Sequence, residues 1–164
     1  MPNDILLKYA TSATLTCAVE SLASDTALLA GIESSVIDNT TAGYDDYLVS
    51  GKVKAGTSPT ATRQIEVWAV AWDGSAWPDV FDGTAGAETI TSAEIRAAIC
   101  RPIAIMATTN TTDRVYHFSG VSLRQAFGGA LPSKVVLFVV HNTGVALNSS
   151  GHEFRVQGVY PQVQ

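Results

Sequence analysis

The segment "KVVLFVVHNTG" (134–144) limits the possible folds more than any other part of the chain. Val135 to Val140 are apolar at every position, so a strand formed here has no polar face to turn toward water. Such a strand needs a neighbour along each edge and cover on each face. The run therefore predicts a central strand buried on both sides.

Other short runs alternate between apolar and polar residues with the period of two that is typical of a strand. In residues 63–72 one face carries only aliphatic side chains, those of Ile65, Val67, Ala69 and Ala71, and an Asp-Gly hairpin signal follows. Further runs lie at 13–22, 27–40, 44–56, 103–109, 114–122 and 153–163. Short strands separated by turn residues in this way predict an all-β, antiparallel two-sheet sandwich.

Two segments carry the signals of short helices that connect strands. Residues 91–102 open on a Thr-Ser cap and stop at Pro102, while residues 122–129 open on Ser122 and stop at a Gly-Gly pair. Neither segment is long enough to form a layer of its own. We therefore expect one or two short connecting helices in an otherwise β protein.

The length of 164 residues suits a single sandwich domain, residues 13–164, preceded by a poorly patterned segment, residues 1–12. We interpret that segment as an N-terminal arm that orders on a neighbouring subunit. The net charge of −5 and the scattered basic residues argue against binding to nucleic acid, and the lack of a long apolar or basic amphipathic stretch argues against membrane binding. With no secretory signal expected at the N-terminus, Cys17 and Cys100 are expected to be buried, reduced thiols.

No catalytic motif is recognisable, so we expect neither an enzyme nor a cofactor. His141, at the end of the most apolar run, is expected to be a hydrogen-bonded structural group. Asp73, Asp79 and Asp82 are close in sequence but lack the dense Asp and Asn spacing of calcium loops, and turn formation explains the Asp-Gly pairs. We expect no metal site.

Three tryptophans in the same region, Trp68, Trp72 and Trp77, have two interpretations. Trp68 and Trp72 leave the same face of a strand about 13 Å apart, a spacing that suits stacking on alternate sugar rings of a glycan. Alternatively, the three side chains cover the face of a sheet or an interface between subunits, where aromatic residues are enriched. The second interpretation is favoured because no polar group is clearly placed to recognise sugar hydroxyls.

Three motifs occur together: "GTSPTATRQIEVW" (56–68), "PDVFDG" (78–83) and "HNTGVALN" (141–148). In this combination, and over nearly its whole length, the chain resembles a family of small virion proteins of tailed bacteriophages and prophages. The resemblance implies a non-enzymatic, jelly-roll-like sandwich that decorates or cements the capsid. It also implies a homo-trimer that docks on the major capsid protein or other virion subunits after synthesis in the host cytoplasm.

The loops that follow the two clearest strands are our candidates for contact with other subunits, because sandwiches place interacting loops at strand ends. The candidate residues are Trp72, Trp77, Asp79 and Phe81 in the first loop and Asn142, Gly144 and Leu147 in the second. An alternative function is a neck-, collar- or fibre-associated module that binds host glycan through the tryptophans. Exposure of these tryptophans in the assembled particle distinguishes the two functions.

Overall fold

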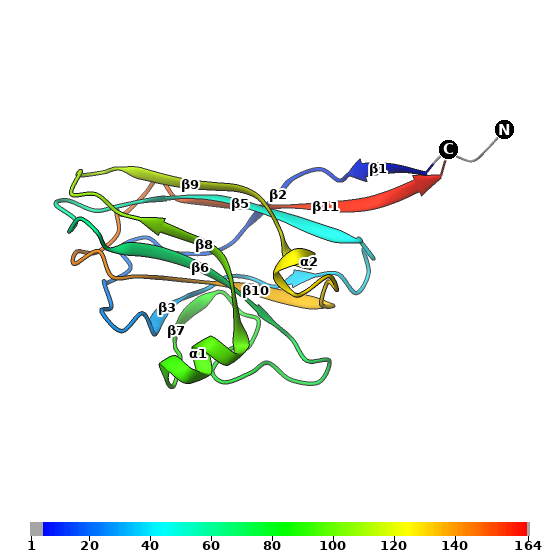
Figure 1. Ribbon diagram of the computed structural model, residues 1–164, viewed down its shortest axis with the longest axis horizontal. Helices are drawn as coiled ribbons and strands as arrows, with labels where there is room; N and C mark the ends of the chain where they lie inside the picture. The colour runs from blue at the N-terminus through cyan, green and yellow to red at the C-terminus, as the bar shows by residue number, and fades with distance from the viewer. Residues whose placement is uncertain (1–4, 164) are drawn as a thin grey trace.

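The computed structural model describes residues 5–163 as two antiparallel β-sheets packed face to face (Figure 1). The first sheet has the order β1-β11-β5-β9, with β2 also paired to β11. Its strands are β1 (Ile5–Tyr9), β2 (Ala13–Leu15), β5 (Asp46–Lys54), β9 (Val115–Ser122) and β11 (Glu153–Val163). The two-sheet sandwich predicted from the sequence is confirmed.

The second sheet has the order β7-β3-β10-β6-β8, with β4 also paired to β10. Its strands are β3 (Ala30–Glu33), β4 (Ile37–Asp38), β6 (Gln64–Ala71), β7 (Gly86–Thr89), β8 (Cys100–Ala107) and β10 (Lys134–His141). β10 lies at the centre, paired with β6 on one side and with β3 and β4 on the other. This is the position that its continuous apolar run predicts.

The connections follow the jelly-roll pattern. We count β1 with β2 as one interrupted strand, count β3 with β4 as another, and leave out β7. Eight strands then remain. Numbered along the chain, they form one sheet of order 1-8-3-6 and another of order 2-7-4-5. Successive strands thus cross repeatedly between the sheets, as in two interlocked Greek keys.

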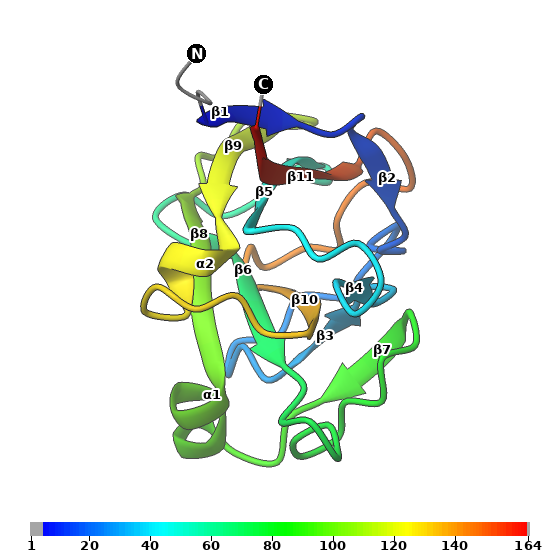
Figure 2. The same cartoon turned by 90° about the vertical axis from the view of Figure 1, so that its right-hand side faces the viewer.

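Apolar side chains form two clusters, one on each face of the second sheet. The larger cluster fills the space between the sheets and includes Val67, Leu137 and Phe154. The smaller one lies on the opposite face, between the second sheet and residues 72–99, and includes Phe81 and Phe138. In Figure 2, α1 (Ala93–Ile99) and β7 lie on this side, away from the first sheet. β10 is therefore buried on both faces because residues 72–99 add a third layer.

Both predicted helices form, although one is shorter than expected. Ser92 caps α1 by accepting a hydrogen bond from the backbone N–H of Ile95, and Ser122 caps α2 (Leu123–Ala126). The prediction that the first helix extends to Pro102 is wrong, because β8 already begins at Cys100. Proline is tolerated in β8 because this strand is at the edge of its sheet and its pairing register shifts beside Pro102.

Two predicted strands are interrupted. In residues 13–22 only Ala13–Leu15 form a strand, although every second side chain stays buried through Val19. In residues 27–40 the run divides into β3 and β4. β3 contains Gly31, and a Cβ at this position would come 2.3 Å from the carbonyl oxygen of Val139. The absence of a side chain allows the two strands to approach.

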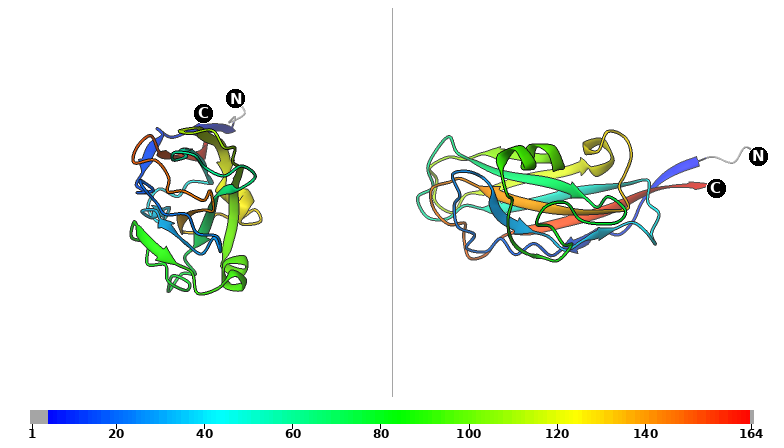
Figure 3. Two further views of the ribbon diagram at one scale, coloured as in Figure 1. Left: turned by 90° about the vertical axis from the view of Figure 1, so that its left-hand side faces the viewer. Right: turned by 90° about the horizontal axis from the view of Figure 1, so that it is seen from below.

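The predicted arm, residues 1–12, includes β1. Residues 1–4 lie outside the described residues. Ile5–Tyr9 pair with the end of β11, so that Tyr9 is opposite Val159 and Ile5 is opposite Val163. β1 and the end of β11 form a two-stranded ribbon that projects beyond the other strands (Figures 1 and 3). Within the chain, Ile5–Tyr9 are thus paired as a strand of the first sheet, and ordering of the arm on a neighbouring subunit stays a prediction.

Candidate functional site

The two loops predicted to contact other subunits lie at opposite ends of the second sheet. In the antiparallel pair of β6 and β10, Ala71 is opposite Val135 and Ile65 is opposite His141. The loop after Ala71 and the loop after His141 are therefore separated by the paired length of the strands, about 20 Å. The seven candidate residues belong to two separate regions.

In the first loop, the structure buries one candidate side chain and leaves the others partly accessible. Phe81 is only 4% exposed and meets the ring of Phe138 edge to face, with 5.2 Å between ring centroids. Its side chain therefore belongs to the smaller apolar cluster and not to the exposed surface on which we expected it. Trp77 packs against the same cluster, and Trp72 is half-buried.

Two of the three aspartates of this region stabilise local turns, and the third joins the loop to Thr91. Asp73 accepts hydrogen bonds from the backbone N–H groups of Ser75 and Ala76, and Asp82 accepts one from Thr84. Asp79 accepts from both the backbone N–H and the hydroxyl of Thr91, at 3.0 and 2.7 Å. Within residues 5–163 no group of three or more His, Cys, Asp or Glu is arranged to hold a metal ion.

The three tryptophans are partly covered and do not form one open platform. The guanidinium carbon of Arg96 lies 5.2 Å from the ring centroid of Trp68, and the Lys134 ammonium lies 4.9 Å from that of Trp72. Trp77 packs closely over Gly83, where a Cβ would come 2.9 Å from the indole Nε1. These contacts agree with the favoured interpretation, in which the tryptophans cover a sheet face.

The second loop is held by the side chain of Asn142 at its start and by the buried side chain of Leu147 near its end. The Asn142 side chain accepts a hydrogen bond from the backbone N–H of Gln64, at 2.8 Å. Gly144 is exposed and has φ of 83°, a conformation that favours glycine. Leu147 is 3% exposed and packs in the core between the sheets. The Leu147 side chain, like that of Phe81, is therefore not part of the accessible surface.

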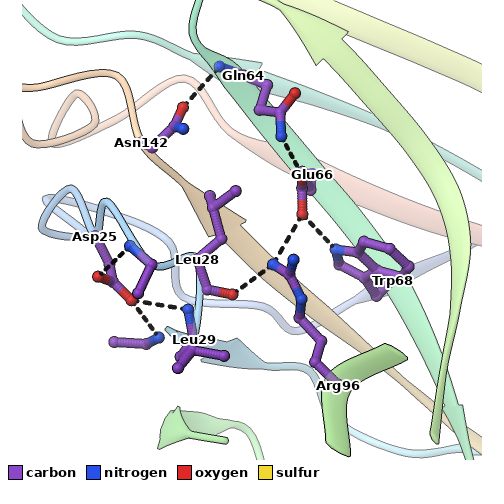
Figure 4. Close-up of polar contacts among 10 residues, drawn as sticks. Asp25, Leu28, Leu29, Gln64, Glu66, Trp68, Arg96 and Asn142 are labelled. Carbon is purple, nitrogen blue, oxygen red and sulfur yellow. Dashed lines mark hydrogen bonds and ion pairs between the residues drawn. The ribbon is translucent and has the colours of Figure 1, made fainter. Parts of the chain in front are cut away.

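A buried ion pair, which was not predicted from the sequence, joins α1 to the second sheet (Figure 4). Glu66 is 3% exposed in β6, and its Oε2 accepts hydrogen bonds from Arg96 at 3.2 Å and from the Trp68 indole at 2.8 Å. Its other oxygen accepts from the Gln64 amide. Arg96 also donates to the carbonyl of Leu28, at 2.7 Å. The one signal in the sequence that could have indicated this ion pair was a glutamate in the strand next to the apolar central strand.

The turn that supplies the Leu28 carbonyl is itself held by a carboxylate. Asp25 accepts hydrogen bonds from the backbone N–H groups of Leu29 and Ala30, both at 2.8 Å (Figure 4). The bond from Ala30 is the largest of the effects that lower the pKa of Asp25. The whole arrangement positions α1 and the third layer, and its chemistry is that of a structural support.

Glu33 is a second buried carboxylate, fully enclosed at the end of β3. It accepts hydrogen bonds from the backbone N–H groups of Gly83 at 2.7 Å and Asp82 at 3.3 Å, and so anchors the "PDVFDG" segment. Burial raises the pKa of Glu33 from 4.5 to about 7, and the nearby acidic groups of Asp82 and Glu88 act in the same direction. The two amide hydrogen bonds oppose this increase.

We predict that Glu33 makes the protein less stable as the pH rises from about 5 to 8. Between pH 4.5 and about 7 the folded state holds a proton that the unfolded state has released, so the free energy of unfolding falls with rising pH. The loss is roughly 2–3 kcal/mol. Urea denaturation of wild type and Glu33→Gln at several pH values should show this fall only in wild type. Parallel pH profiles would contradict the prediction.

The outer face of the first sheet has a shallow pocket of about 340 Å³. It contains one carboxylate, Glu153, whose oxygens are held by Lys52 at 3.0 Å and Arg155 at 2.8 Å. His117 lies opposite Lys52 on the neighbouring strand. A glycosidase uses two carboxylates across a cleft, and this pocket presents a single, already paired carboxylate.

One histidine, His141, and both cysteines are held in the core. The two ring nitrogens of His141 contact the hydroxyl of Thr143 at 3.0 Å and the carbonyl of Leu22 at 2.9 Å, and burial lowers the pKa of the imidazole. The structural role predicted for His141 is confirmed. Cys17 and Cys100 are free and buried, and burial raises the pKa of each thiol to about 12. Neither thiol is therefore poised to react.

The ribbon of β1 and β11 carries the most exposed apolar surface of the described chain. Cross-strand pairing places the side chains of Ile5, Leu7 and Tyr9 on one face with those of Pro161 and Val163. The exposed fractions of Ile5, Leu7, Tyr9 and Val163 are 71, 58, 55 and 59%. We call these five residues the apolar strip.

The apolar strip faces away from the second sheet. Gly158 of β11 is opposite Tyr47 of β5, whose ring belongs to the core between the sheets. Pro161 and Val163 have the opposite strand parity from Gly158, so their side chains leave the outer face. A cluster of large apolar side chains exposed in this way is typical of a surface that contacts another molecule.

The chain matches no protein-family model, no curated protein and no solved structure. Within residues 5–163 no helix is both long and apolar enough to cross a membrane.

Proposed function

We propose that this protein is a non-enzymatic structural protein of a tailed-bacteriophage virion. It binds the outer surface of the head shell and stabilises it. The observation that carries this proposal is the apolar strip, which a subunit folded in water leaves exposed on a projecting ribbon. Burial of such side chains against a shell supplies binding free energy, and many copies on one lattice add avidity.

The jelly roll suits this role because its own core is complete. The space between the sheets and the outer face of the second sheet are each filled by an apolar cluster. Every buried polar side-chain atom among the described residues has a hydrogen-bond partner. The subunit therefore folds before it docks, and docking requires only the ribbon and nearby surface.

A neck- or fibre-associated module that binds glycan is the alternative. The half-buried tryptophans favour the head-shell function, because Arg96 and Lys134 already lie over the rings of Trp68 and Trp72. Copy number separates the two functions. A decoration protein is present in numbers comparable to the shell subunits, whereas a neck or fibre protein is present in a handful of copies per particle.

We predict that particles lacking this protein release their DNA sooner than complete particles on heating or at low ionic strength. The physical reason is that subunits bridging the shell add contacts that must break before the shell opens. Dye-accessible DNA measured against temperature tests this, with particles reconstituted from purified protein as the control. Identical release curves for depleted and complete particles would contradict the proposal.

A further inference from the structure

Most sheet edges in the described chain carry a feature that discourages pairing with another chain. The β8 edge has Pro102 and a register shift, and the β7 edge is only four residues long and carries Glu88. The β9 edge pairs with β5 in a register that shifts along the strand, and it contains Gly120, whose φ is 63°. Such features bend, shorten or charge an edge.

The β1 edge differs from these. Its sequence is ILLKY, without proline or glycine, and Lys8 is its single charged residue. β1 is the outermost strand of the first sheet, and alternate residues of an edge strand direct their N–H and C=O groups away from the sheet. An apolar edge strand with an unbroken pairing register is a template for another strand.

The sequence of β1 complements itself in the antiparallel direction. With Leu7 at the centre, Ile5 of one copy lies opposite Tyr9 of the other, and Leu6 lies opposite Lys8. The pairs of Ile and Tyr are of the β-branched and aromatic kind that stabilises adjacent strands, and no two lysines lie directly opposite each other. The same surface then serves both copies, as a two-fold interface requires.

We propose that two copies of this chain pair through β1, antiparallel about a two-fold axis at Leu7, so that their first sheets become one continuous sheet. The two apolar strips then lie on the same face, side by side, and form one wider strip. The pairing stands on the geometry of β1, while the use of the doubled strip against a head shell rests on the proposed function. The product is a dimer, in place of the trimer expected from the resemblance.

Sedimentation velocity of the full chain with charge-swapped variants tests the pairing. Leu7 is 58% exposed, so Leu7→Lys and Leu7→Glu should both fold, which circular dichroism checks. Wild type should sediment as a dimer. Each variant alone places like charges opposite each other and should raise the dissociation constant at least about tenfold, and an equimolar mixture of the two should restore the dimer.

Ile105→Lys is the matched control, because Ile105 is 57% exposed on the β8 edge, and this variant should remain dimeric. A wild-type monomer or trimer at all concentrations, or dimers of either Leu7 variant as tight as wild type, would overturn the proposal. Failure to bind shells by a protein that still dimerises would count against the proposed function and leave the pairing intact.

Discussion

Replacing Phe81 by alanine is expected to lower the free energy of unfolding by about 3–5 kcal/mol. Phe81 lies in a segment whose Asp-Gly turns suggest a surface loop, yet its side chain is 4% exposed and packs edge to face on Phe138. Truncation leaves a cavity in the smaller apolar cluster, because the packed side chains around it relax only in part. Equilibrium urea denaturation measures the loss.

Ile105→Ala provides the comparison for Phe81→Ala, because Ile105 is 57% exposed in β8. Its loss should stay under about 1 kcal/mol. If Phe81→Ala also costs under about 1 kcal/mol, residues 72–99 do not form a packed third layer, and Phe81 becomes a candidate for subunit contact again.

Replacing Arg96 by methionine is expected to cost about 3 kcal/mol or more. The substitution leaves the carboxylate of Glu66, 3% exposed, without its cationic partner, and removes the hydrogen bond to the Leu28 carbonyl. A buried charge deprived of its partner is among the most costly single changes in a protein. Urea denaturation at pH 7 measures the effect.

Two further variants isolate the role of the ion pair. Arg101→Met removes a guanidinium whose side-chain hydrogen bonds, within residues 5–163, go to the nearby carbonyls of Ala98 and Cys100, and should change stability by under about 0.5 kcal/mol. Glu66→Leu combined with Arg96→Met should recover most of the loss, because it removes both buried charges. A double variant as unstable as Arg96→Met alone would show that the loss comes from packing and not from charge.

Local pattern was sufficient to predict most strands and both helices. The continuous run at Val135–Val140 predicts a central strand, and the alternation of residues 63–72 predicts its neighbour β6. Hydroxyl caps at Ser92 and Ser122 place the helix starts. These features depend only on residues that are close in the sequence, so they can be predicted from one sequence.

Features that depend on distant residues were not predicted. In the sequence alone, residues 72–99 resemble a series of turns. Phe81 and Trp77 are buried by Phe138 and other residues far along the chain, so the local pattern does not predict their burial. The partner of Glu66 is Arg96, thirty positions away on a helix. Sequence spacing gives no information about such contacts until the path of the chain is known.

The surface was the least predictable part of the molecule. Both candidate loops follow core strands, but the antiparallel pairing of β6 with β10 sends them to opposite ends of the sheet. Ile5–Tyr9 lack the alternation that indicates a strand, and their partner Val159–Val163 lies at the other end of the chain. Contact with another subunit through Trp72, Trp77, Asp79, Asn142 or Gly144 stays a prediction.

Co-sedimentation of the purified protein with phage heads stripped of it tests the central claim most directly. Wild type should rebind in numbers comparable to the shell subunits. Ile5→Ser combined with Val163→Ser removes two side chains that are 71 and 59% exposed at the far end of the apolar strip, and should weaken binding about 30- to 100-fold. Leu6→Ser, on the opposite face of β1, should bind like wild type.

Dense rebinding is expected for wild type and for Leu6→Ser, and loss of binding is expected for the variant of the apolar strip. Shells that ignore the wild-type protein, or that bind it only a handful of times per particle, would contradict a head-decoration role. Full binding by the Ile5 and Val163 variant would contradict attachment through the ribbon.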